Sequence, residues 1–133
     1  MLGIGRRGTP RKIGVKGEGK EKVAYRILEP ELLEKQDVLI VGGGDSAVET
    51  ALLLTNKNNV TLSYRGEKFS RVKPKNLDNI NNAINNKTIN VLLNSNVDEI
   101  KDETVDIKIN DNVKTIKNDL VYIFAGGELP TEF

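Results

Sequence analysis

VLIVGGGDSAVETALLL, residues 38–54, is the stretch that decides the fold of this 133-residue chain. Its first four residues form a short apolar run bounded by polar residues and glycine, which is typical of a strand buried on both faces of a parallel sheet. The apolar residues after the glycines recur at helical spacing and predict a helix over residues 45–55. The inner side of this helix is expected to hold Ala47, Val48, Ala51, Leu52 and Leu54.

The segments that follow continue the alternation of strand and helix. Residues 60–65, VTLSYR, are expected to form a second strand, and residues 88–95, TINVLLNS, a third. Between them a helix is predicted over residues 76–86, because Leu77, Ile80 and Ile84 recur at helical spacing. This β-α-β-α-β order is the mononucleotide-binding half of a doubly wound fold.

The pattern changes after the third strand. Three short segments, NVDEI, TVDIKIN and VKTIK, are separated by the polar turns KDE and NDN. In the second, Val105, Ile107 and Ile109 alternate with polar residues, as in a half-exposed antiparallel strand. LVYIFAGG, residues 120–127, then predicts a final buried strand. The expected fold is therefore α/β, a Rossmann-like parallel sheet with a three-stranded antiparallel β-meander crossover and a final parallel strand.

The first third of the chain is less regular. Residues 1–22 are rich in Gly, Arg and Lys and show no sustained period, so they are expected to form an irregular basic connector. A nucleic-acid contact is the alternative, but no aromatic residue interleaves with the basic ones, which favours a solvated linker. Residues 23–28 are expected to be extended, and Pro30 suits the first turn of a short helix. The domain itself is assigned to residues 23–133.

Composition excludes several classes of function. The 20 basic and 19 acidic residues nearly cancel, so no bulk attraction to nucleic acid or to a membrane is expected. Cysteine and histidine are absent, which excludes disulfides, thiolate or imidazole metal sites, and Cys–His or Ser–His–Asp catalysis within these residues. The chain shows neither a long apolar span nor an apolar segment after its basic start, so a cytoplasmic location is expected.

Residues 42–47, GGGDSA, match the dinucleotide fingerprint G-x-G-x-x-A. Gly42 permits the sharp turn out of the strand, Gly44 lets the backbone approach a pyrophosphate, and Ala47 lets helix and strand pack closely. The amino-terminal N–H groups of the helix then face the phosphates. A plain tight turn is the alternative, but the strand-turn-helix context favours a nucleotide. Asp45 and Ser46 are the candidate N-cap residues.

The end of the second strand bears on the choice of nucleotide. NAD sites commonly place an acidic residue there, whereas NADP sites place arginine near the 2′-phosphate. Here Tyr64 and Arg65 stand at the tip and Arg71 follows, so the two arginines are the leading 2′-phosphate ligands and Tyr64 is a candidate to stack on adenine. The alternative is a solvated basic loop with Glu67 as an ion-pair partner. NADPH is therefore expected in preference to NADH.

VLIVGGGDSAVE, VTLSYRGEKFSRVKPKN and VYIFAGGELPTEF together resemble the NAD(P)H-binding domain of thioredoxin-reductase-like pyridine nucleotide-disulfide oxidoreductases. The resemblance covers essentially the whole chain. It implies a domain inserted into an FAD-binding domain, with IGRRGTPRKIGVKGE leaving that domain and AGGELPTEF re-entering it.

The resemblance also implies where the nucleotide is contacted. It places Gly43, Gly44, Asp45 and Ser46 around the pyrophosphate, Tyr64, Arg65 and Arg71 around the adenosine 2′-phosphate, and Ala125, Gly126 and Gly127 near the nicotinamide. The chain has one extra residue between Arg65 and Arg71 compared with the usual thioredoxin reductase pattern.

Two features depart from that family. Its redox C-x-x-C corresponds here to AYRIL, with Tyr25 and Leu28 near the cysteine positions. Its FAD fingerprint lies upstream of this domain, so the chain is expected to be an excised domain or a split or truncated product.

The resulting hypothesis is an NADPH-binding domain of an FAD-dependent oxidoreductase that is inactive alone, because the cofactors carry the hydride chemistry. No residue of the chain is expected to act as acid, base or nucleophile. FAD and a homodimer are expected only for the full-length enzyme, whose final electron acceptor is left open. The alternative is a non-catalytic nucleotide-sensing or protein-interaction module with a Rossmann-like fold.

Overall fold

A computed structural model describes residues 14–25, 30–69 and 71–124. Its elements are β1 (Val23–Ala24), the 3-10 helix η1 (Pro30–Leu32), β2 (Asp37–Val41), α2 (Asp45–Leu54), β3 (Asn59–Ser63), α3 (Pro74–Asn85), β4 (Asn90–Leu92), β5 (Ser95–Ile100), β6 (Thr104–Ile109), β7 (Asn112–Lys117) and β8 (Leu120–Ile123). The order β-α-β-α-β, meander, final strand that the sequence predicts is confirmed.

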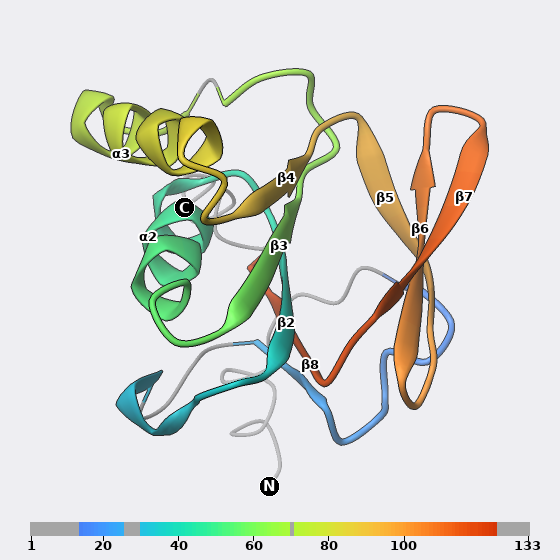
Figure 1. Ribbon diagram of the computed structural model, residues 1–133. Helices are drawn as coiled ribbons and strands as arrows, with labels where there is room; N and C mark the ends of the chain where they lie inside the picture. The colour runs from blue at the N-terminus through green and yellow to red at the C-terminus, as the bar shows by residue number, and fades with distance from the viewer. Residues whose placement is uncertain (1–13, 26–29, 70, 125–133) are drawn as a thin grey trace, which may run out of the picture.

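The strands form two sheets. The larger has five parallel strands in the order β1-β8-β2-β3-β4, and the smaller has three antiparallel strands in the order β5-β6-β7. Helices α2 and α3 lie on one side of the large sheet and the small sheet lies on the other (Figure 1). The final strand returns through the meander to pair between β1 and β2.

This three-layer arrangement explains the continuous apolar run of β2. Val38 and Ile40 point into the core beneath the two helices, whereas Leu39 points into the core shared with the small sheet. All three are at most 2% exposed. A strand between two cores needs apolar side chains on both faces, and this one has them.

The helices begin and end close to the expected residues. α3 starts earlier than predicted, at Pro74, with Lys73 as its N-cap, because proline suits the first helical position. Of the side chains expected to face inward, Ile80 is buried, but Ile84 is 38% exposed. No helix in the described part of the chain is long and apolar enough to cross a membrane.

Residues 14–22 are packed, although the sequence predicted a solvated linker. The N–H of Ile100 donates to the carbonyl of Lys16 at 2.8 Å, and Lys20 pairs with Asp102 at 2.8 Å. Gly17 has a φ of +89°, and a Cβ there would collide with the Ile100 carbonyl group. These residues therefore lie against the end of β5. The assignment of residues 1–22 to a connector stays a prediction, and its first 13 residues lie outside the described ones.

A buried carboxylate organises the same segment. Glu18 accepts hydrogen bonds from the backbone N–H of Gly14 at 2.8 Å and from the Tyr25 hydroxyl at 2.7 Å. Burial, together with Glu18, raises the pKa of Tyr25 to about 12. Tyr25, near one of the positions where the resemblance places a redox cysteine, is thus part of a structural hydrogen bond.

Candidate nucleotide-binding site

The turn from β2 into α2 depends on Gly42. Its φ of +139° lies in a region that side chains rarely adopt. A Cβ there would also lie 3.3 Å from the Cβ of Ala47 and 3.4 Å from that of Phe124. Ala47 is fully buried, so a small residue is needed at both positions. The geometry agrees with the roles of the first and last fingerprint residues as turn and packing positions.

Gly44 is the N-cap of α2 and leaves open space above the helix terminus. A Cβ at this position would have no described atom within 4 Å. No described side chain caps the helix, so the expectation that Asp45 or Ser46 is the N-cap is wrong. Uncapped N–H groups in the first turn of a helix are free to bind an anion.

The middle glycine serves a different purpose. Gly43 occupies an x position of the fingerprint, where glycine is not required. A Cβ on Gly43 would lie 2.6 Å from the Cζ of Tyr64 and closer still to Cδ1 and Cε1. The Tyr64 ring thus occupies the space that a side chain at residue 43 would need, and only glycine at this position leaves room for the ring.

Tyr64 is held firmly in this position. Its N–H donates to the carbonyl of Leu92 at 3.0 Å, and its carbonyl accepts from the N–H of Ser95 at 3.0 Å. Its ring stacks on Phe69 with centroids 5.6 Å apart and planes 7° apart. Phe69 is only 9% exposed. Because Phe69 and Gly43 both lie against the Tyr64 ring, they limit the room for adenine stacking, which stays a prediction.

The side chain of Asp45 turns away from its own helix terminus. Its Oδ1 accepts a hydrogen bond from the backbone N–H of Lys73 at 2.8 Å and another from Nδ2 of Asn76 at 2.7 Å. The same Asn76 nitrogen donates to Glu49 at 2.8 Å. The Lys73 N–H, followed by Asn76, lowers the pKa of Asp45 below its usual value. Asp45 therefore joins the start of α2 to the start of α3.

Arg65 and Arg71 are exposed on the loop between β3 and α3. The ion pairs among the described residues lie around the small sheet, and neither arginine takes part in one. The pairing with Glu67 that the alternative predicted is also absent among the described residues. Both guanidinium groups are thus available to a ligand.

The chain passes the glycine turn again after β8. There the N–H of Phe124 donates to the carbonyl of Val41 at 2.8 Å. The predicted nicotinamide contacts Ala125, Gly126 and Gly127 follow directly and lie outside the described residues.

Comparison with known proteins places this geometry in a family. The whole chain, residues 1–133, matches the model of the pyridine nucleotide-disulphide oxidoreductases. The chain belongs to this family.

Solved structures of similar proteins share the fold. Bacillithiol disulfide reductase from Staphylococcus aureus superposes with a TM-score of 0.86 and 36% identity over 90% of this chain and 38% of its own. Thioredoxin reductase from Lactococcus lactis gives a TM-score of 0.74 and 28% identity over 89% of this chain and 42% of its own. The resemblance to thioredoxin-reductase-like proteins is confirmed, and the chain itself has no cysteine and so no C-x-x-C.

Curated relatives match over shorter lengths. Bacilliredoxin reductase from Bacillus subtilis is 33% identical over 93 residues, which is 68% of this chain and 29% of the relative. Ferredoxin–NADP reductase from Ignicoccus hospitalis is 36% identical over 70 residues, which is 52% of this chain and 23% of the relative. The chain thus spans less than a third of these curated relatives.

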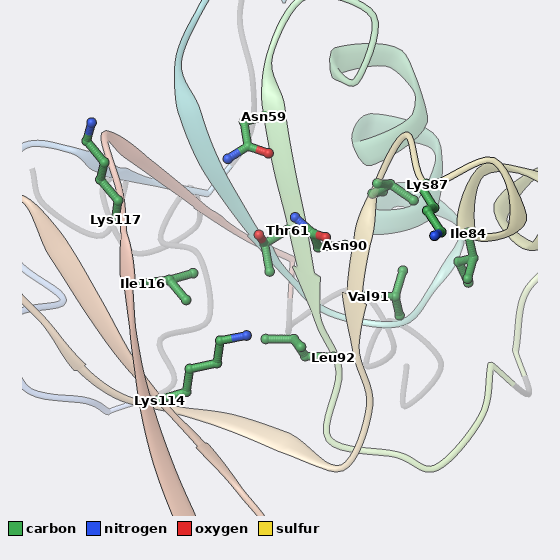
Figure 2. A pocket seen from close by; sticks show the side chains of 11 residues that line it. Asn59, Thr61, Ile84, Lys87, Asn90, Val91, Leu92, Lys114, Ile116 and Lys117 are labelled. Carbon is green, nitrogen blue, oxygen red and sulfur yellow. The ribbon is translucent and has the colours of Figure 1, made fainter.

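A separate groove of about 460 Å³ lies away from the dinucleotide fingerprint, residues 42–47. It is lined by Asn59, Thr61, Ile84, Lys87, Ile89, Asn90, Val91, Leu92, Lys114, Ile116 and Lys117. Figure 2 shows Lys114 reaching from β7 toward Leu92, while Lys117 points away. No residue of the glycine turn or of the β3–α3 loop lines this groove, so it is distinct from the candidate nucleotide site.

Sequence reasoning missed three participants in the site: Phe69, Asn76 and the backbone N–H of Lys73. Phe69 had a signal, because it is an apolar aromatic residue flanked by polar residues in the stretch EKFSR, residues 67–71. The contact between Gly43 and Tyr64 also had one, because the fingerprint leaves a third glycine unexplained. The hydrogen bonds to Asp45 had none, since they join residues about 30 positions apart.

Proposed function

We propose that this chain is the NADPH-binding domain of an FAD-dependent oxidoreductase. In that enzyme it would present the nicotinamide for hydride transfer to the flavin, and the two cofactors supply the redox chemistry. The chain's own residues contribute binding and orientation. Its partner is then an FAD-binding domain of the same or a neighbouring polypeptide, in the cytoplasm.

The observation that carries the proposal is the neighbourhood of Gly44. An uncapped helix terminus with open space in front of it suits a pyrophosphate, because unpaired N–H groups and the helix dipole both favour an anion there. The adjacent loop adds Arg65 and Arg71, which have no ion-pair partner among the described residues. Family membership supports dependence on FAD and a nicotinamide nucleotide in general.

The preference for NADPH over NADH rests on the same loop. Guanidinium groups bind phosphate through paired, charge-assisted hydrogen bonds. The tip of β3 offers Tyr64 and Arg65 and lacks the carboxylate that would bind a ribose 2′-hydroxyl. The relatives named for ferredoxin, bacilliredoxin and bacillithiol disulfide offer candidate electron acceptors for the whole protein.

Calorimetric titration of the 133-residue chain with NADPH and with NADH tests this function. Replacing Arg65 by alanine should weaken NADPH binding about tenfold or more, since hydrogen bonds to charged groups contribute roughly 1.5–3 kcal/mol. NADH binding should change less than about twofold, because NADH has no 2′-phosphate. Lys114→Ala, which removes the same charge at the distant groove, is the control and should change neither. Absence of NADPH binding at millimolar concentration would overturn the proposal, and equal loss for both nucleotides would overturn the role of Arg65.

A further inference from the structure

The loop between β3 and α3, residues 64–73, is anchored to the glycine turn at its beginning. There the Tyr64 ring lies against Gly43, on the turn itself. Tyr64 in turn stacks on Phe69, the buried side chain in the middle of the loop. A Cβ on Gly66 would also approach the Tyr64 ring, at 2.7 Å from Cε2. The first half of the loop is therefore packed around one aromatic ring.

A second anchor holds the end of the same loop. The Lys73 N–H donates to Asp45, the first residue of α2, and Asn76 adds a second hydrogen bond to the same oxygen. Asn76 is 7% exposed, so its amide is largely shielded from water. Because Asp45 is engaged in these bonds and does not cap α2, the N–H groups of that helix terminus also stay open.

The two anchors enclose the stretch that carries both arginines. Arg65 directly follows the packed ring of Tyr64, and Arg71 stands two residues before the bonded N–H of Lys73. A flexible loop would have to be ordered when it binds a phosphate, and that ordering costs affinity. A loop that is already held in place binds with a smaller loss of entropy.

We propose that Asp45 and Phe69 are positioning residues that hold the described residues of this loop, 64–69 and 71–73, in the conformation that selects the 2′-phosphate of NADPH. The inference rests on the proposed function and goes further than it in two ways. It assigns Asp45 a role in nucleotide selection, in place of the pyrophosphate contact that the resemblance implies. It also adds Phe69, which contacts no part of the nucleotide in this account.

The decisive quantity is the ratio of NADPH to NADH affinity. If the loop is loosened, its two arginines must be ordered when they bind the 2′-phosphate, which only NADPH carries. The affinity for NADPH should then fall more than the affinity for NADH, so the ratio should fall. A residue that merely stabilises the fold, or one that contacts the pyrophosphate shared by both nucleotides, changes both affinities alike and leaves the ratio unchanged. The ratio therefore separates a positioning role from either alternative.

The experiment compares Asp45→Asn and Phe69→Leu with the wild-type chain by calorimetric titration with NADPH and NADH. Each variant should lower the affinity ratio about fivefold, because Phe69→Leu removes one aromatic contact and Asp45→Asn turns hydrogen bonds to a charged group into hydrogen bonds to a neutral one. Phe69→Tyr keeps an aromatic ring for the stack and should restore the ratio. Asp106→Asn is the matched control, because Asp106 is also a carboxylate with two partners, Thr115 and Lys101, but on the small sheet.

The outcomes are distinguishable. If the wild type binds NADPH more tightly than NADH and both variants lose this preference while melting as folded proteins, the inference holds. If the wild type shows the preference and the variants keep it, or lose both affinities in equal proportion, the positioning role is wrong and the proposed function stands. If the wild type binds neither nucleotide, the proposed function fails and the inference with it.

Discussion

Replacing Gly43 by alanine tests the packing of the site without any ligand. The new Cβ would lie 2.6 Å from the Cζ of Tyr64, whereas carbon atoms pack at about 3.5–4.0 Å, so the ring must move by about 1 Å or more. That movement disturbs the stack on Phe69, which as an aromatic pair contributes roughly 0.5–1.5 kcal/mol. Overpacking of this kind typically costs about 1–3 kcal/mol, and the lower entropy of an unfolded alanine offsets roughly 0.4–1 kcal/mol.

The net expectation for Gly43→Ala is a loss of about 1–2 kcal/mol in the free energy of unfolding. Urea titration followed by circular dichroism measures it on the 133-residue chain. Gly44→Ala is the matched control, because its Cβ would meet no described atom. It loses the preference for glycine over alanine at the N-cap, but the lower entropy of an unfolded alanine offsets most of that loss, so the free energy of unfolding should change by about 0.5 kcal/mol or less.

A double-mutant cycle identifies the cause. In a Tyr64→Leu background the ring is gone, so adding Gly43→Ala should cost little, and the coupling energy should be about 1–2 kcal/mol. If Gly43→Ala costs the same with and without the Tyr64 ring, the ring is not what requires glycine at this position, and the reasoning is refuted.

Two further predictions concern the segment before β1. Gly17→Ala should destabilise the chain by more than about 2 kcal/mol, because a positive φ and a collision with the Ile100 carbonyl group act together. Gly14→Ala is the control: Gly14 has a φ of +80° but no described atom near its Cβ, so this variant should cost only about 1 kcal/mol. Equal melting temperatures for the two variants would contradict the prediction. The pKa of Tyr25 is raised to about 12 from its ordinary value near 10, so the folded state favours the protonated phenol. The contribution of the protonated Tyr25 hydroxyl to the free energy of unfolding should be complete below pH 10 and should be lost as the pH rises toward 12. Urea titrations across this range should show a shallower decline for Tyr25→Phe than for the wild type, and parallel curves would contradict the assignment.

Local patterns were enough to predict most of the fold. The apolar run of β2 is visible in the sequence because both of its faces are buried, and α2 is visible because its buried residues recur at helical spacing. The packing of residues 14–22 was not predictable in this way. Their glycine- and lysine-rich composition suggests a linker. Their order comes from contacts with the end of β5 and with the turn after it, and the pair formed by Lys20 and Asp102 joins positions more than 80 residues apart.

The candidate site was likewise predictable only where its features are encoded by residues close together in the sequence. The roles of Gly42 and Ala47 in turning and packing could be predicted, because the fingerprint encodes them at fixed spacing along the chain. The direction of the Asp45 side chain could not, because helix-capping statistics place it on its own helix terminus, whereas its partner N–H belongs to the next helix. Tyr64 was singled out as a ligand contact; the fingerprint leaves Gly43 unexplained, but that Tyr64 is its packing partner emerges only when the two strands lie side by side.

The most direct test of the central claim is a titration of the isotopically labelled chain with NADPH, followed by NMR. If the nucleotide binds where we propose, the backbone amide signals of Gly43, Gly44, Ser46 and Arg65 should shift with a common saturation curve. The signals of Lys87 and Lys114 at the distant groove should stay in place. Shifts confined to that groove, or no shifts at millimolar NADPH, would contradict the account.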